Sequence, residues 1–218
     1  IVLAPNSVQE NADMAYEAFD LAEKYRHPVI VASDAAIGQM VEAVELKEFK
    51  EHDINTYDWA VRGRKDDEPK RTAENVYYAM GADNYKEYLL KKYQEIEETE
   101  QRWESFCTED AEIVLVAYGI SSRVSKEAVK IARAKGLKLG LIRPRTLWPY
   151  PRKAFDALRD SVVGFLSVEM SILGQMVDDI KLATDGKYPV HCYNEFANVP
   201  EPDIAIQMAE DMLKQYKK

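Results

Sequence analysis

The part of the chain that follows Ala111 repeats one pattern, in which a strand-like apolar run precedes an amphipathic helix pattern. Residues 112–119, Glu-Ile-Val-Leu-Val-Ala-Tyr-Gly, predict a strand that ends in a glycine turn. Ser121 or Ser122 then begins a helix that Gly136 terminates. The same reasoning predicts strands over 139–143, 164–168 and 190–193, and helices over about 151–160, 174–184 and 202–215. This alternation predicts an α/β fold, with a mostly parallel sheet and helices on both faces.

The first 46 residues predict a strand, a helix and a second strand. After an apolar start, Ser7-Val8-Gln9-Glu10 has the form of a capping box that begins a helix, and His27-Pro28 ends it. The apolar run Val29–Ala32 is typical of a strand covered on both faces. Such a unit is too small to stand alone. Because the chain opens inside a strand pattern without Met, we expect it to be the C-terminal portion of a longer polypeptide.

The segment 47–109 has a different pattern of charged and apolar residues. Basic and acidic residues are interleaved over 62–71, which predicts an exposed connection. Leu89, Ile96 and Trp103 are separated by seven and predict one stripe of a long helix. We therefore predict three parts: the end of one domain over 1–46, a linker and long helix over 47–109, and a complete α/β domain over 110–218.

Charge and cysteine content exclude several classes of protein. The 218 residues carry 29 basic and 38 acidic side chains, a net charge of −9, without a basic cluster of the kind that nucleic-acid binding needs. No apolar run approaches the roughly 20 residues of a membrane-spanning helix. Cys107 and Cys192 are the two cysteines, too few for a self-contained zinc or iron–sulfur site. A reducing cytoplasm is the compartment that we expect.

Two segments carry candidate functional residues. Residues 143–151 contain three prolines, with Arg143 and Arg145 close to Trp148, and this rigid exit from a strand fits either a contact with a partner or a structural crossover. Glu169 stands at the carboxyl end of a predicted strand, shortly before Gln175. Since no His or Cys stands near Glu169 in the sequence, a hydrogen-bonding or interface role is favoured over general acid or base catalysis. These five residues are the candidate interface.

The turn 118–123 fits either an anion site at a helix start or a plain structural turn. One glycine is far from a dinucleotide-binding fingerprint, so the structural reading is favoured. The sequence has no nucleophile elbow, phosphate loop or paired-carboxylate motif. From the residues alone, the chain is an α/β protein without a visible active site.

Longer stretches resemble a known family. Residues 112–151 resemble the transketolase C-terminal domain, a Rossmann-like unit shared by thiamine diphosphate enzymes. Residues 2–10, 22–28 and 33–40 resemble the end of the pyrimidine-binding domain of 2-oxoacid:ferredoxin oxidoreductases, which is part of a thiamine-diphosphate-binding fold. With 143–151 and 174–179, the resemblance covers nearly the whole chain. It is greatest toward the subunit of the 2-oxoisovalerate (3-methyl-2-oxobutanoate) enzymes that carries these two domains.

The resemblance implies an enzyme that oxidatively decarboxylates a branched-chain 2-oxoacid with CoA, giving acyl-CoA, CO2 and reduced ferredoxin. It implies thiamine diphosphate, Mg²⁺ and iron–sulfur clusters in the parent complex, with none of them bound by this chain alone. The implied partners in an oligomer are a diphosphate-binding subunit and a ferredoxin-like subunit, together with ferredoxin and CoA. The charge and the lack of a long apolar run predict neither nucleic acid nor membrane as a partner. The family's catalytic and cofactor-binding residues match no position of this chain.

The resemblance thus implies a scaffold and interface portion that is inactive alone. Two alternatives stay open. One is the homologous subunit of an enzyme for pyruvate, 2-oxoglutarate or an arylpyruvate. The other is a non-catalytic binding or structural module.

Overall fold

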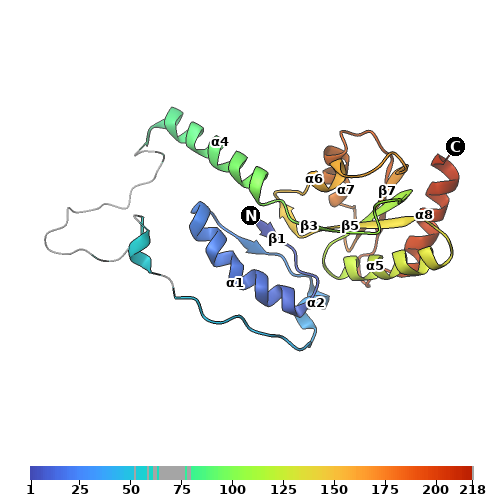
Figure 1. Cartoon of the computed structure of the whole chain (residues 1–218), viewed down its shortest axis with the longest axis horizontal. Coiled ribbons are helices and arrows are strands. Elements are labelled where there is room, and N and C mark those ends of the chain that lie inside the picture. The colour runs from blue at the N-terminus through green and yellow to red at the C-terminus, as the bar shows by residue number, and fades with distance from the viewer. Residues whose placement is uncertain (52, 58, 61–62, 64–76, 78–79, 218) are drawn as a thin grey trace.

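The chain forms two units, each built on its own sheet, that lie side by side along the long axis of the molecule (Figure 1). The structure is a computed structural model, and it describes residues 1–217 except 52, 58, 61–62, 64–76 and 78–79. The predicted α/β class is confirmed. Most of the predicted connection over 62–71 lies outside the described residues, and the three-part domain division stays a prediction.

The second unit contains a five-stranded sheet in the order β3-β5-β4-β7-β8. The strands β5, β4, β7 and β8 pair in parallel, and β3 pairs antiparallel with β5. The strands are β3 (Trp103–Phe106), β4 (Ile113–Val116), β5 (Leu139–Pro144), β7 (Gly164–Glu169) and β8 (Val190–Asn194). Four of these five strands follow the predicted apolar runs.

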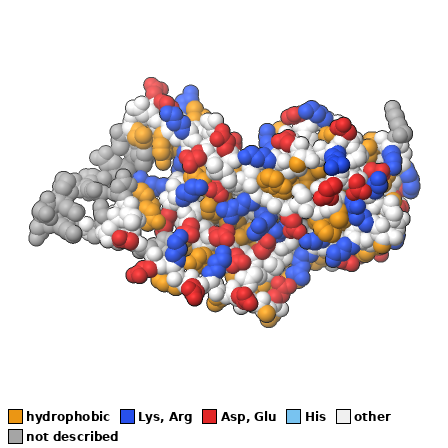
Figure 2. All heavy atoms as spheres, in the orientation of Figure 1, with side chains coloured by type: hydrophobic (Ala, Val, Ile, Leu, Met, Phe, Trp, Pro, Cys, Tyr) orange, Lys and Arg blue, Asp and Glu red, His pale blue; other side chains and the backbone are white. Residues whose placement is uncertain are grey.

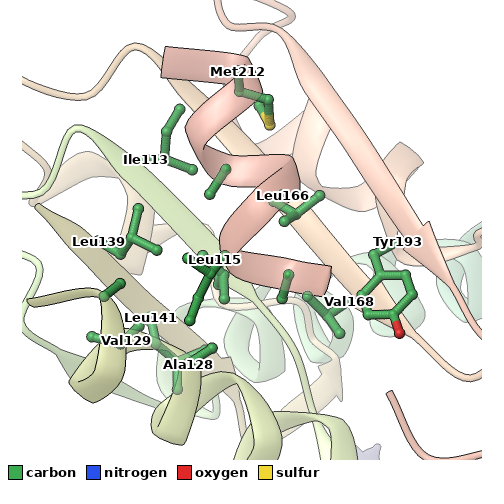
Figure 3. Close-up of a cluster of buried hydrophobic side chains, with 14 of the residues drawn as sticks. Ile113, Leu115, Ala128, Val129, Leu139, Leu141, Leu166, Val168, Tyr193 and Met212 are labelled. Carbon is green, nitrogen blue, oxygen red and sulfur yellow. The ribbon is translucent and has the colours of Figure 1, made fainter. Parts of the chain in front are cut away.

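Helices cover both faces of this sheet. The helices α5 (Gly119–Ala134) and α8 (Pro202–Tyr216) lie on one face, and α6 (Lys153–Asp156) and α7 (Met176–Ala183) on the other. Since successive strand residues point to opposite faces, Ile113 and Leu115 of β4 pack in the α5–α8 core (Figure 3), whereas Val114 and Val116 pack toward α6 and α7. All four are fully buried, which explains why the sequence shows an uninterrupted apolar run.

The first unit contains a three-stranded sheet in the order β2-β1-β6. Its strands are β1 (Val2–Leu3), β2 (Ile30–Val31) and β6 (Thr146–Trp148), so its third strand comes from the second half of the chain. The helix α1 (Val8–Tyr25) covers the sheet, and the Ser7 side chain accepts a hydrogen bond from the Glu10 amide at 3.1 Å, as the capping box predicts. The unit also contains the short helix α2 (Ala35–Gln39) and a 3-10 turn η1 (Ile54–Thr56).

Three sequence predictions are wrong in detail. The helix α4 (Ala82–Thr99) ends before Trp103, which instead begins β3, because hydrogen bonds to β5 draw that segment into the sheet. The strand β2 is not covered on both faces, since Ile30 is 57% exposed at the edge of the described sheet. The helix predicted over 151–160 is limited to the four residues of α6.

Candidate functional site

The carboxyl edge of the five-stranded sheet is the place where the fold would position a ligand. The chain leaves β4 through α5 to reach β5 on one side, and later adds β7 on the other side of β4. The strand order therefore reverses between β5 and β7, and ligands of open α/β sheets gather at such a point. The helices α5 and α7 both begin at this edge, so both direct toward it backbone amides that have no partner inside the helix.

A carboxylate of the first unit occupies the start of α5. Asp34 Oδ2 accepts a hydrogen bond from the Ile120 amide at 2.7 Å, while Oδ1 accepts one from the Ile37 amide at 2.9 Å and caps α2. Gly119 precedes this contact with a φ of +57°, and a Cβ there would collide with the Asp34 carboxylate. Glycine is thus needed for both its backbone conformation and its lack of a side chain. The geometry supports the structural reading of the turn 118–123.

Glu169 occupies the start of α7 in the same way. Its side chain is buried and accepts hydrogen bonds from the amides of Gln175 at 2.7 Å and Met176 at 3.1 Å. The hydroxyl of Ser167 donates a third at 2.6 Å. A carboxylate at a helix N-terminus with several donors is a stable arrangement. The hydrogen-bonding role predicted for Glu169 matches this geometry, and the backbone amide of Gln175 takes part in it.

The structure also brings a cysteine to Glu169 that the sequence does not place there. Cys192 lies on β8, next to Ser167 of β7, and its thiol is 3.7 Å from a carboxylate oxygen of Glu169. Burial, together with the neighbouring Glu169 charge, raises the pKa of Cys192 to about 12. Because the thiolate is the nucleophilic form, this thiol is unreactive at neutral pH.

Three further acidic groups share this environment. Burial raises the pKa of Tyr118, of Asp179 and, most strongly, of Tyr150, and the carboxylate of Glu169 adds to each shift. The Tyr150 hydroxyl is buried and has no hydrogen-bond partner. Tyr118, Tyr150 and Asp179 are therefore shifted toward their protonated, uncharged forms.

Arg143 and Arg145 join the two units of the chain. The Arg143 guanidinium donates to both carboxylate oxygens of Glu10 at 2.7 and 2.8 Å, and its Nε lies 3.1 Å from a carboxylate oxygen of Glu104. Arg145 lies 3.4 Å from Glu10 as well. Burial alone would raise the pKa of Glu10, but hydrogen bonding and charge from Arg143 outweigh it and lower this pKa. The Arg143 side chain is only 3% exposed, so the chain itself already engages it.

Trp148 also makes contacts inside the chain. Its ring lies 5.9 Å from that of His27 and 5.8 Å from that of Tyr93, and its backbone belongs to β6 in the first sheet. A subunit interface at Arg143, Arg145, Trp148, Glu169 and Gln175 stays a prediction. Sequence reasoning missed Glu10 and Asp34 as residues that join the units, although both are recognisable as parts of helix caps.

The rest of the described surface gives little sign of a separate site. Acidic and basic side chains are interspersed over the face shown in Figure 2. Across the described residues, no three or more His, Cys, Asp or Glu side chains form a group that could hold a metal ion. None of the helices that the structure describes is both long and apolar enough to cross a bilayer.

Two family models match the chain in succession. Residues 1–106 match "Pyruvate flavodoxin/ferredoxin oxidoreductase, thiamine diP-bdg", and residues 111–208 match "Pyruvate:ferredoxin oxidoreductase core domain II". Over 98% of the chain, the fold is similar to that of a 2-oxoglutarate:ferredoxin oxidoreductase from Magnetococcus marinus, with a TM-score of 0.73 and 20% identity, covering 42% of that chain. At this identity the likeness shows the fold alone.

Curated relatives are more similar in sequence. The ketoisovalerate oxidoreductase subunit VorB of Methanothermobacter marburgensis is 49% identical over 190 residues, covering 84% of this chain and 52% of the relative. The 2-oxoglutarate synthase subunit KorA of the same organism is 30% identical over 218 residues, covering 85% of this chain and 56% of the relative. The chain thus spans about half the length of these relatives. It belongs to the 2-oxoacid:ferredoxin oxidoreductase family.

Proposed function

We propose that this chain is part of a thiamine-diphosphate-dependent oxidoreductase that oxidatively decarboxylates 2-oxoisovalerate with CoA, giving acyl-CoA, CO2 and reduced ferredoxin. The observation that carries the proposal is the difference in identity between two kinds of relative. The chain is 49% identical to a ketoisovalerate subunit over 84% of its length and 30% identical to a 2-oxoglutarate subunit over 85% of its length. We propose that it works in the cytoplasm, where its two free thiols stay reduced.

Within such a complex, we assign the chain a scaffold and interface role. At the sheet edge where a ligand would bind, Asp34 and Glu169 already bond the first amides of α5 and α7. The described residues offer no donor set that fits Mg²⁺, and two cysteines cannot ligate an iron–sulfur cluster. We therefore assign thiamine diphosphate, Mg²⁺ and the clusters to other parts of the complex. In this proposal the partners are a diphosphate-binding subunit and a ferredoxin-like subunit.

The contribution of this chain would be to hold two surfaces in a fixed relation. Glu10 of α1 binds Arg143 at the end of β5, and Asp34 ahead of α2 binds the start of α5. Asn6 of the first unit also donates to the Ser122 hydroxyl at 3.3 Å. Three contacts that are separate in sequence restrain the angle between the two sheets, and a fixed angle is what a shared active site between subunits requires.

The substrate is tested by turnover of the assembled complex. The assay follows CoA-dependent reduction of ferredoxin with 2-oxoisovalerate, pyruvate, 2-oxoglutarate and an arylpyruvate in parallel. We expect the highest kcat/KM for 2-oxoisovalerate. A preference for another acid would assign the chain to that enzyme instead, and an assembled complex that oxidises none of them would identify a non-catalytic module.

The scaffold role has its own test. Thiamine diphosphate and Mg²⁺ are titrated into the isolated chain by calorimetry, with the assembled complex as the positive control. We expect no tight binding to the chain alone. Micromolar or tighter affinity would show that the chain holds the cofactor itself.

A further inference from the structure

Two adjoining loops at the carboxyl edge of the second sheet expose large apolar side chains. Ile172 is 67% exposed and Leu173 is 88% exposed in the loop after β7, and Phe196 is 69% exposed in the loop after β8. A single exposed leucine is ordinary, but grouped apolar side chains indicate a contact surface. We call Ile172, Leu173 and Phe196 the edge patch.

The loops that carry the edge patch are fixed to each other. The side-chain amide of Asn194 donates to the Ile172 carbonyl at 3.1 Å, and the Glu195 amide donates to the Glu169 carbonyl at 2.9 Å. Gly174 has a φ of +75° and lies so close to Cys192 that a Cβ would stand 2.7 Å from its sulfur. Together with the buried Glu169 carboxylate, these contacts hold the loop in one conformation. A surface ordered in advance loses less entropy when it binds.

The loops and helix starts that flank the edge patch carry mostly acidic side chains. Residues 170–180 and 194–204 contain no Lys, Arg or His. Apart from Asp179, whose pKa is raised, they contain four acids, which lie in the loop after β8, at the α8 cap and in the first turns of α7 and α8. These acids are Asp178, Glu195, Glu201 and Asp203. The carboxylate of Asp178 lies 3.5 Å from Lys181 in an exposed contact, which is worth little in water. The segments that flank the apolar centre therefore carry an excess of acidic over basic side chains.

This charge pattern selects among possible occupants. A second copy docking through the same patch would place acids opposite acids, because a twofold contact uses one surface on both sides. An anionic lipid surface would be repelled for the same reason. A protein surface with an apolar socket and a rim of Lys and Arg matches both the apolar centre and the acidic segments that flank it.

We propose that the edge patch docks into an apolar, basic-rimmed surface of another subunit of the oxidoreductase. This inference rests on the proposed function, since it takes the partner from that complex. Leu173 is the central residue, because it is the most exposed of the three and its loop is fixed on both sides.

The test measures assembly of the tagged chain with the co-expressed diphosphate-binding and ferredoxin-like subunits. L173D is compared with L46D, a matched leucine of the first unit that is 82% exposed. Binding is measured by biolayer interferometry over a salt series, and mass by light scattering. We expect L173D to weaken binding at least 10-fold and L46D less than 3-fold, with both melting temperatures unchanged. We also expect D178K and D203K to bind more weakly than wild type, and this difference to be larger at low salt than at high salt.

Several results would overturn the inference. Equal binding by L173D and wild type, or equal losses in L173D and L46D, would remove the edge patch from the interface. A wild-type dimer that L173D breaks would identify a second copy as the occupant, and binding to anionic vesicles that L173D abolishes would identify lipid. If the wild-type complex assembles through the edge patch but oxidises no 2-oxoacid, the proposed function is refuted and the docking role of the patch is supported. If the complex is active and L173D assembles normally, the docking role is refuted and the proposed function is supported.

Discussion

The ion pair between Glu10 and Arg143 gives the sharpest prediction about stability. In the wild-type chain the Asn6 amide donates to the Glu10 carboxylate at 3.0 Å. Replacing Glu10 by Gln removes the charge but retains an oxygen that can accept this hydrogen bond. The Arg143 guanidinium would lose its bidentate partner while staying buried. Removing one member of a buried pair is destabilising because the remaining charge is left without compensation.

The magnitude follows from the burial of the two groups. Breaking a fully buried pair costs about 3–5 kcal/mol. The Glu10 side chain is 21% exposed and Glu104 still lies 3.1 Å from Arg143 Nε, so we expect about 2 kcal/mol. In a chain of this size 1 kcal/mol lowers Tm by about 2–4 °C, which gives a fall of about 4–8 °C for E10Q.

The assay is thermal unfolding followed by circular dichroism, with E127Q as the matched control. Glu127 pairs with Lys130 in an exposed contact at 3.2 Å, and we expect its substitution to change stability by less than about 0.5 kcal/mol. Since the pKa of Glu10 is lowered in the folded state, the stabilisation is complete above the ordinary glutamate pKa of about 4.3 and is lost as pH falls through the folded value. An E10Q variant as stable as wild type at pH 7, or a difference that persists unchanged at pH 3, would refute the reasoning.

Three further predictions concern the carboxyl edge. G119A should lower stability by at least about 1 kcal/mol more than G136A in urea unfolding, because both glycines have positive φ but only the Gly119 Cβ would meet a neighbour, Asp34. Cys192 should react with iodoacetamide at pH 8 far more slowly than a free thiol when its peptide is followed by mass spectrometry, because its pKa is raised to about 12; fast labelling would contradict this. Y150F should leave stability unchanged or raise it, since the hydroxyl has no partner, whereas Y193F should lower it by about 1 kcal/mol by removing the acceptor of the Glu201 amide.

Local patterns predict the second unit well and the connection between the units poorly. The strands β4, β7 and β8 follow apolar runs whose burial needs no knowledge of distant residues. The seven-residue spacing that Trp103 continues predicts a helix, but its segment pairs with β5, which lies about 40 residues further on. A four-residue strand has too few positions for its own period to compete with such a spacing.

The candidate site shows the same division. The position of Glu169 after an apolar run is enough to predict a polar role at a sheet edge. Its contact with Cys192 spans 23 positions, the contact of Asp34 with Ile120 spans 86, and that of Glu10 with Arg143 spans 133. The first pair forms because β7 and β8 are neighbours in one sheet, and the other two form because the two units meet. The sequence alone carries no spacing that would reveal any of them.

The first sheet is completed by β6, a strand from the second half of the chain, and this has a consequence for biosynthesis. Val2 pairs with Trp148, so the ribosome must add 148 − 2 = 146 residues before this pairing can form. At about 5–20 residues per second this takes about 7–29 s. During that interval one side of β1 has no strand to pair with, and an unpaired strand edge is a site of aggregation. Rapid synthesis of the second unit, or a chaperone that covers β1, would therefore raise the yield of folded protein.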